Sequence, residues 1–244
     1  MVSLQCEVKL QKDVIDLIYS RKSFYFLHNK IPDLSRASTW SRGDLVSNDI
    51  QVVVVGKSGY GKSTILNTVV REKIFETDDV TGCTRVMQSA EYQFEINDEY
   101  CNFSMADLPG IGENPTLDKQ YINLYRNAIN KSHVTLYILR ADQRDYSVDL
   151  WAFSELFKTF SEKSKVIVVL NAVDKVEPLN RQLPFVLSRE QYHNLENKVE
   201  KICSEFSISK KQVVAISAIE DYNVDELINL VGKKLNPYLQ PKIA

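Results

Sequence analysis

The 244-residue sequence has few glycines, no long hydrophobic segment and no paired cysteine motif. None of its apolar runs approaches the roughly 20 residues needed to cross a bilayer, so no transmembrane segment is expected. Residues 1–20 carry too many charges for the apolar part of a signal peptide, which favours a cytoplasmic protein. The four cysteines show neither a C-x-x-C pair nor metal-ligand spacing, which indicates reduced thiols rather than a disulfide framework.

Strong charge of either sign is also absent, since the formal net charge is −2. A general nucleic-acid binder needs a basic stripe, so no nucleic-acid partner is expected. The length suits one α/β domain with a modest addition. Most of the eight glycines lie in or beside candidate phosphate-facing loops, namely Gly56, Gly59, Gly61, Gly82, Gly110 and Gly112.

Residues 51–64, QVVVVGKSGYGKST, combine a strand, a glycine-rich loop and the start of a helix. Four consecutive valines predict a strand that is buried on both faces. The loop fits G-x-x-x-x-G-K-[ST], a pattern whose glycines let backbone N–H groups surround an anion. Lys62 would reach the β- and γ-phosphates, and the Ser63 hydroxyl would bind a Mg²⁺ ion bridging them. The segment predicts a nucleoside triphosphate site formed by Lys57, Ser58, Gly59, Tyr60, Gly61, Lys62, Ser63 and Thr64.

Apolar strands alternate with helical patterns along the rest of the chain, which predicts a mainly parallel sheet covered on both faces. The predicted strands after the first are residues 86–96, 100–106, 133–139, 166–170 and 212–216, giving six in all. The first two of these, joined by a short acidic link, are expected to form an antiparallel hairpin. Helices are expected at about 117–131, from the loop after residue 146 to about 161, at 189–206 and at 224–235, with Pro237 and Pro241 ending the structure.

A D-x-x-G tetrapeptide, Asp107 to Gly110, follows directly after one predicted strand. Its aspartate would bind Mg²⁺, usually through water, and the N–H of Gly110 would contact the γ-phosphate. The polar loop at residues 76–85 would supply a threonine to Mg²⁺ and the γ-phosphate. Thr84 is the first choice and Thr81 the second; the alternative for each is an ordinary loop threonine.

A second carboxylate, Asp174, ends the sequence Asn-Ala-Val-Asp after the strand at residues 166–170. Its two oxygens can accept hydrogen bonds from N1–H and the 2-amino group of guanine, whereas adenine would leave the charge unsatisfied. Asn171 would brace this site, and a backbone N–H of Ser217 or Ala218 would reach the guanine O6 atom. These residues predict selectivity for guanine.

These motifs, in this order and spacing, resemble the GTP-binding domain of the translation-factor-class GTPases over residues 50–235. The loop GKSGYGKS together with LRADQRDYSVD resembles the septin-like branch, and within it the bacterial YfjP-type GTPases. The resemblance implies a P-loop NTPase fold, GTP or GDP with Mg²⁺ as ligands, and an unidentified protein effector. It also implies a GTP-binding domain at residues 49–244 after an extension and connector at 1–48. A helix expected at 9–20 would pack on the domain or dock on a partner or membrane surface.

Three positions depart from the family pattern. Ile111 stands where many such domains have a water-orienting glutamine, so unassisted hydrolysis should be slow. Gly59 replaces the asparagine through which some bacterial relatives recruit potassium. Ala172 replaces the lysine whose stem covers the base, which should weaken guanine affinity without reversing selectivity.

The sequence therefore predicts a slow GTPase acting as a switch or assembly timer, with catalytic roles for Lys62, Thr84 and Gly110. Nucleotide-bound domains of the resembling branch often dimerise across the nucleotide, so Arg144 could act in trans on a second copy. Arg140 is a weaker candidate; the alternative is a surface arginine paired with Asp142 or Asp145.

Two other functions remain open from the sequence. One is a GTP-held dimerisation module with little turnover, which Ile111 favours. The other is a P-loop kinase or ATPase, which would leave the guanine-selective residues without a purpose. The three histidines, His28, His133 and His193, lack metal spacing and are interpreted as structural or surface residues.

Overall fold

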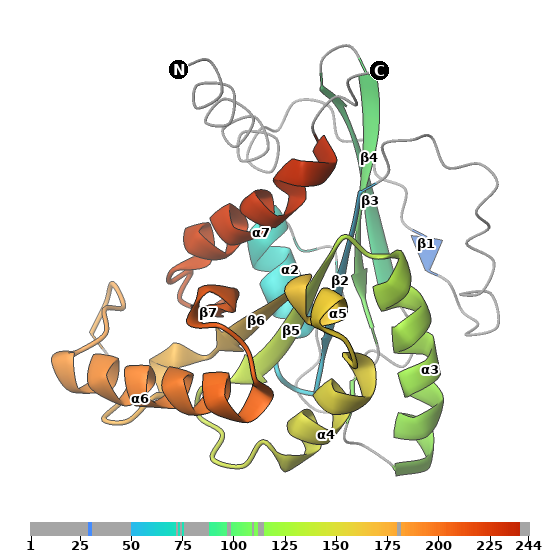
Figure 1. Ribbon diagram of the computed structural model, residues 1–244. Coiled ribbons are helices and arrows are strands. Elements are labelled where there is room, and N and C mark those ends of the chain that lie inside the picture. The colour runs from blue at the N-terminus through green and yellow to red at the C-terminus, as the bar shows by residue number, and fades with distance from the viewer. Residues whose placement is uncertain are drawn as a thin grey trace, which may run out of the picture.

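The computed structural model describes most of the chain from residue 50 onward (Figure 1). The described residues are 29–30, 50–71, 73, 75, 88–96, 99–108, 110–111, 115–179 and 182–239. The helix expected at residues 9–20 lies outside them, as does the boundary near residue 49. The division into an extension and a GTP-binding domain therefore stays a prediction from the sequence.

One sheet organises the described residues, with strand order β1-β3-β4-β2-β5-β6-β7. Parallel pairing joins β4 to β2, β2 to β5, β5 to β6 and β6 to β7, whereas β3 pairs antiparallel with β4 and β1. The strands are β1 (Asn29–Lys30), β2 (Ile50–Gly56), β3 (Gln88–Ile96), β4 (Glu99–Asp107), β5 (Val134–Arg140), β6 (Val166–Asn171) and β7 (Val213–Ala215).

The expectation of six strands was wrong, because the described residues form a sheet of seven strands. Four of its neighbouring pairs are parallel and two are antiparallel. The additional strand, β1, has two residues, too few for any hydrophobic pattern to reveal it. The antiparallel hairpin of β3 and β4 was predicted correctly.

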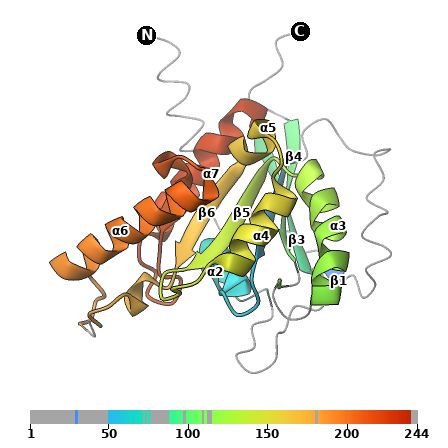
Figure 2. The same cartoon turned by 60° about the horizontal axis from the view of Figure 1, so that its bottom comes forward.

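Helices cover both faces of the sheet, as predicted (Figure 2). Helices α3, α4 and α6 lie on one face, and α2 and α7 lie on the other. Their bounds are α2 (Lys62–Val70), α3 (Pro115–Lys131), α4 (Ser147–Leu156), α5 (Phe160–Ser164), α6 (Arg189–Phe206) and α7 (Val224–Leu239), with short 3-10 turns η2 (Val173–Lys175) and η3 (Lys210–Gln212). Because both faces are covered, the side chains of β5 and β6 are almost entirely buried.

Two helices differ from the sequence-based prediction. A single helix to about residue 161 was expected, but α4 ends at Leu156 and a new helix, α5, begins at Phe160. Thr159 starts that helix with a capping box: its Oγ1 accepts from the N–H of Glu162, whose carboxylate accepts from the N–H of Thr159. Pro237 does not end the structure but lies within the last turn of α7. The backbone hydrogen bond that it cannot donate is therefore one of the last in the helix.

None of the helices in the described part of the chain is both long and apolar enough to cross a membrane.

Candidate nucleotide site

The phosphate loop, residues 56–61, connects the carboxyl end of β2 to the first turn of α2 at the lower edge of the sheet in Figure 1. Gly59 and Gly61 have φ angles of 74° and 85°, in the left-handed region that favours glycine. A Cβ atom at Gly61 would lie 2.7 Å from Nδ2 of Asn171, whereas one at Gly59 would meet nothing within 4 Å. The loop is thus packed tightly at its helix end and open at Gly59.

The segment after β4 lies directly against this loop. The N–H of Ser58 donates to the carbonyl of Ile111 at 3.0 Å, and the N–H of Ile111 donates to that of Gly56 at 3.3 Å. A Cβ atom at Gly110 would lie 2.5 Å from the Cα of Ser58, so a larger residue would displace the phosphate loop. The side chain of Ile111 is 2% exposed and belongs to the hydrophobic core. Gly110, the glycine of the D-x-x-G motif, is therefore placed beside the phosphate loop. The side chain of Ile111, the next residue, packs into the core.

Three groups predicted to bind phosphate or metal meet at the start of α2. Lys62 is buried, and its Nζ donates to the carbonyl of Lys57 at 3.4 Å. The hydroxyl of Ser63 donates to Oδ2 of Asp107 at 2.5 Å, and this carboxylate is fully buried at the end of β4. A hydroxyl and a carboxylate in contact form the hard oxygen set that Mg²⁺ prefers, so these residues fit the ion.

The remaining predicted ligands of this region are placed less closely. The Nζ of Lys57 lies 5.8 Å from the ring centroid of Tyr60. Thr64, one residue beyond the loop motif, accepts a hydrogen bond at its carbonyl from Thr68 Oγ1 within α2. Thr84 and Thr81 lie outside the described residues, which contain no cluster of three or more His, Cys, Asp or Glu able to hold a metal.

Asn171, the last residue of β6, links the phosphate loop to the loop after β7. Its Nδ2 donates to the carbonyl of Tyr60 at 3.0 Å, and its Oδ1 accepts from the N–H of Ala218 at 3.1 Å. The side chain is 7% exposed, so both hydrogen bonds are shielded from water. Asn171 therefore fixes the distance between the phosphate-binding loop and the loop expected to hold the base.

Asp174 lies in the η2 turn, and its Oδ1 accepts a hydrogen bond of 2.6 Å from the hydroxyl of Ser217. Ser217 is fully buried and its N–H donates to the carbonyl of Tyr222 at 3.1 Å. The structure brings Asp174, Ser217 and Ala218 together, although the two backbone N–H groups expected to reach guanine already donate to Tyr222 and Asn171. Ala172 precedes the turn with a φ of 62°, an uncommon conformation for alanine.

Arg140 contacts the phosphate loop, which the sequence reasoning missed. Its Nε and Nη2 donate to the two oxygens of Asp142, and Nη1 donates to the carbonyl of Gly59 at 3.1 Å. Burial would raise the pKa of Asp142, but the hydrogen bonds and charge of Arg140 outweigh it and lower that pKa. The weaker candidate for a trans role is thus held within its own chain.

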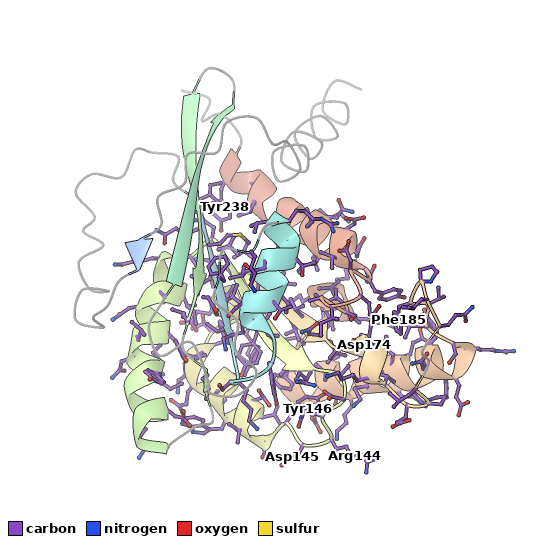
Figure 3. All side chains as sticks on the ribbon, turned by 180° about the vertical axis from the view of Figure 1, so that it is seen from behind. Arg144, Asp145, Tyr146, Asp174, Phe185 and Tyr238 are labelled. Atoms are coloured by element: carbon purple, nitrogen blue, oxygen red, sulfur yellow. The ribbon has the colours of Figure 1, made fainter. Side chains whose placement is uncertain are left out.

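Arg144 has a different setting, in the loop between β5 and α4. It is exposed and makes no hydrogen bond or ion pair with any residue that the structure describes. The two acids proposed as its partners are engaged elsewhere, Asp142 with Arg140 and Asp145 with the N–H and hydroxyl of Ser147. Figure 3 shows Arg144 and Asp145 at the lower edge of the molecule. The loop itself is anchored, because Nζ of Lys198 on α6 donates to the carbonyl of Gln143 at 2.7 Å.

Asp149 on α4 is a second contact of the phosphate loop that the sequence reasoning missed. The hydroxyl of Tyr60 donates to its Oδ2 at 3.1 Å, and the carboxylate is 2% exposed. The sequence offers one indication of this contact, an acid within the apolar stretch at residues 148–153. It cannot indicate the partner, because Tyr60 lies 89 positions away. His133, by contrast, is structural: its Nδ1 accepts from the N–H of Gln51, at the other end of β2.

Comparison with known proteins gives two relatives in Escherichia coli K12 that are described as uncharacterized. YkfA is 30% identical and YfjP 28% identical over 146 residues, which is 60% of this chain. The match covers 48% of each, so the chain corresponds to about half the length of these relatives. Neither establishes the septin-like placement, which stays a prediction.

A solved structure with a similar fold is that of Era in complex with MgGDPNP and a segment of 16S ribosomal RNA. It is 25% identical, the TM-score is 0.57, and the match covers 77% of this chain and 57% of Era. The model of the 50S ribosome-binding GTPase family matches residues 51–172, which contain the phosphate loop, Asp107 and Asn171. The chain belongs to the 50S ribosome-binding GTPase family.

Proposed function

We propose that this protein binds GTP and GDP at the site between the phosphate loop and Asp174, and hydrolyses GTP slowly as a Mg²⁺-dependent switch or assembly timer. The observation that carries the proposal is the convergence at one sheet edge of the phosphate loop, the Ser63–Asp107 contact and the Asn171–Ala218 link. Family membership supports guanine-nucleotide chemistry, and the Era complex contains MgGDPNP.

At the phosphate end, the chain supplies positive charge and N–H donors. Lys62 would exchange its contact with the Lys57 carbonyl for a nucleotide phosphate, and the N-terminus of α2 adds its partial positive charge. Ser63 and Asp107 would hold Mg²⁺, which when bound neutralises charge on the phosphate oxygens. Gly110 would offer its N–H to the γ-phosphate from the segment packed on Ser58.

At the base end, Asp174 would accept the N1–H and 2-amino hydrogens of guanine, and Ser217 orients the carboxylate. Adenine presents an acceptor at N1 and no 2-amino group, so it would leave this carboxylate uncompensated. The N–H of Ala218 would reach O6 of guanine only by sharing or leaving its bond to Asn171.

Slow turnover follows from Ile111. Its side chain is buried in the core and carries no polar atom, so it cannot orient an attacking water molecule. The same observation favours the second candidate, in which GTP holds a dimer or scaffold together with little turnover. An arginine supplied in trans would distinguish these cases, because such a residue accelerates hydrolysis by about 10³–10⁵. Arg144 is exposed in the loop that follows β5, which suits that role.

One experiment tests nucleotide choice. Asp174→Asn should weaken GDP binding at least about tenfold, because the amide replaces one acceptor by a donor. The same change should improve binding of xanthosine diphosphate, whose 2-oxo group accepts from that amide. Glu220→Gln, an exposed acid in the neighbouring loop, is the matched control. Equal GDP affinity in wild type and Asp174→Asn, or a preference of wild type for ADP, would refute the base site.

A second experiment tests activation. GTP turnover per molecule is measured over a wide range of protein concentration in wild type, Arg144→Ala and the control Lys211→Ala, whose exposed lysine lies near the opposite sheet edge. A specific rate that rises with concentration, and stays low only in Arg144→Ala, supports dimer-assisted hydrolysis. A low and constant rate in all three supports the scaffold alternative or an outside activator.

A further inference from the structure

Tyr60, between the two left-handed glycines of the phosphate loop, is anchored at both ends. Its carbonyl accepts from Asn171 Nδ2 at 3.0 Å, and its hydroxyl donates to Asp149 Oδ2 at 3.1 Å. The side chain is 4% exposed, so it points into the protein rather than toward solvent or ligand. Next to it, the carbonyl of Gly59 accepts from Arg140. Gly59 and Tyr60, the crest of the phosphate loop, are thus hydrogen-bonded to residues of three elements, namely β5, β6 and α4.

Asp149 is an unusual residue for its surroundings. It lies in the first turn of α4 with an exposure of 2%, and Tyr137 donates to its backbone carbonyl at 2.8 Å. Burial raises the pKa of the Asp149 carboxyl to about 6, while the hydrogen bond from Tyr60 and the charge of Lys57 oppose that rise. Near neutral pH the carboxylate is largely ionised, and a hydroxyl bound to an ionised acceptor is held more strongly than one bound to a neutral acceptor.

A buried carboxylate is costly to a fold, and an apolar residue at this place in the core would avoid that cost. Apart from the N–H of its own residue, the hydrogen-bond donor that this carboxylate meets among the described residues is Tyr60, which belongs to the phosphate loop. This points to a role in the loop rather than in helix packing.

We propose that Asp149 is a positioning residue for nucleotide binding, which acts through the hydroxyl of Tyr60 to hold the crest of the phosphate loop in its ligand-receiving conformation. This rests on the proposed function, because it assigns a role within the same site. Segment 140–149 then makes two hydrogen bonds to the phosphate loop, one from Arg140 to Gly59 and one from Tyr60 to Asp149. Arg144 lies between Arg140 and Asp149 in the chain.

Four variants separate positioning from general stability. Tyr60→Phe removes the donor, Asp149→Ala removes the acceptor, and Asp149→Asn retains an amide oxygen that can accept from Tyr60. Tyr137→Phe is the matched control, since it removes a buried tyrosine hydroxyl from the backbone carbonyl of the same aspartate. Each variant is measured for its dissociation constant for a fluorescent GDP analogue with Mg²⁺, for KM and kcat with GTP, and for resistance to urea.

Tyr60→Phe and Asp149→Ala are expected to weaken GDP binding about tenfold and to raise KM more than they lower kcat. Asp149→Asn should restore most of the affinity lost in Asp149→Ala. Tyr137→Phe should lose urea resistance comparable to Tyr60→Phe but keep wild-type affinity.

Wild-type affinity in Tyr60→Phe, or an equal loss in Tyr137→Phe, would overturn the proposal while leaving the nucleotide site intact. Failure of the wild-type protein to bind GDP would instead refute the proposed function and the positioning role with it. If Asp149→Ala does not fold, the comparison of Tyr60→Phe with Tyr137→Phe still decides the question.

Discussion

At the scale of single residues, two glycines of similar backbone conformation differ in what surrounds them. Both Gly59 and Gly61 are left-handed, so alanine at either position adds strain of about 1 kcal/mol. Only at Gly61 would the added methyl also meet Asn171, at 2.7 Å. The environment, and not the dihedral angle alone, decides which glycine the site requires.

Gly61→Ala should therefore weaken GDP binding about tenfold more than Gly59→Ala, because displacing Asn171 disturbs both loops that it joins. Titration of each variant with a fluorescent GDP analogue measures the difference. Equal dissociation constants would mean that Asn171 can move without consequence.

The Ser63 hydroxyl provides a prediction about Mg²⁺. Ser63→Ala removes the group that contacts Asp107 and would bind the ion, so GTP affinity in the presence of Mg²⁺ should fall about tenfold. In the presence of EDTA the variant and the wild type should bind alike, which makes the metal-free measurement an internal control. An equal loss under both conditions would indicate damage to the loop rather than loss of a metal ligand.

At the scale of elements, helix α6 starts at a capping box that follows the η2 turn in the chain. The hydroxyl of Ser188 accepts from the N–H of Gln191 at 3.1 Å, and Oε1 of Gln191 accepts from the N–H of Ser188 at 3.0 Å. Gln191 is fully buried and also donates to the carbonyl of Val176, just after the η2 turn. This cap fixes where α6 begins relative to Asp174.

Ser188→Ala should lower the free energy of unfolding by about 1 kcal/mol, because the N–H of Gln191 loses its acceptor. Ser204→Ala, at an exposed position late in the same helix, should leave stability almost unchanged. Urea denaturation of both variants tests the prediction, and similar midpoints would show that the cap contributes little.

At the scale of the whole molecule, Asp149 connects the site to global stability. Its pKa is raised from 3.8 to about 6 in the folded protein, so the folded state binds the proton more tightly than the unfolded state. The contribution of the protonated Asp149 carboxyl to the free energy of unfolding is therefore complete below about pH 4. It is lost as the pH rises through about 6.

Relative to Asp149→Asn, the wild type should lose about 1 kcal/mol of unfolding free energy between about pH 5 and about pH 7. Urea unfolding of both proteins across that range gives the difference directly, and groups that titrate equally in both cancel. A difference that does not change with pH would mean that the carboxyl titrates outside this window.

Local patterns were sufficient for most of the fold. The valine run of β2, the helical period of α6 and the acidic link between β3 and β4 are short-range features, so their elements were predicted closely. The break between α4 and α5 and the continuation of α7 through Pro237 were missed. The break depends on the capping box at Thr159, and the continuation depends on the geometry of the last helical turn. Neither can be deduced from the spacing of apolar residues.

The sequence by itself determined where the candidate site lies, because Lys62, Ser63, Asp107 and Asp174 stand at or just after the ends of strands and parallel strands bring their carboxyl ends to one edge. Only the tertiary structure decided which side chains hold those residues in place. Arg140 reaches Gly59 and Tyr60 reaches Asp149 across 81 and 89 positions. Such contacts depend on how the end of β5 and helix α4 pack beside the phosphate loop, and no periodicity in the sequence encodes that packing.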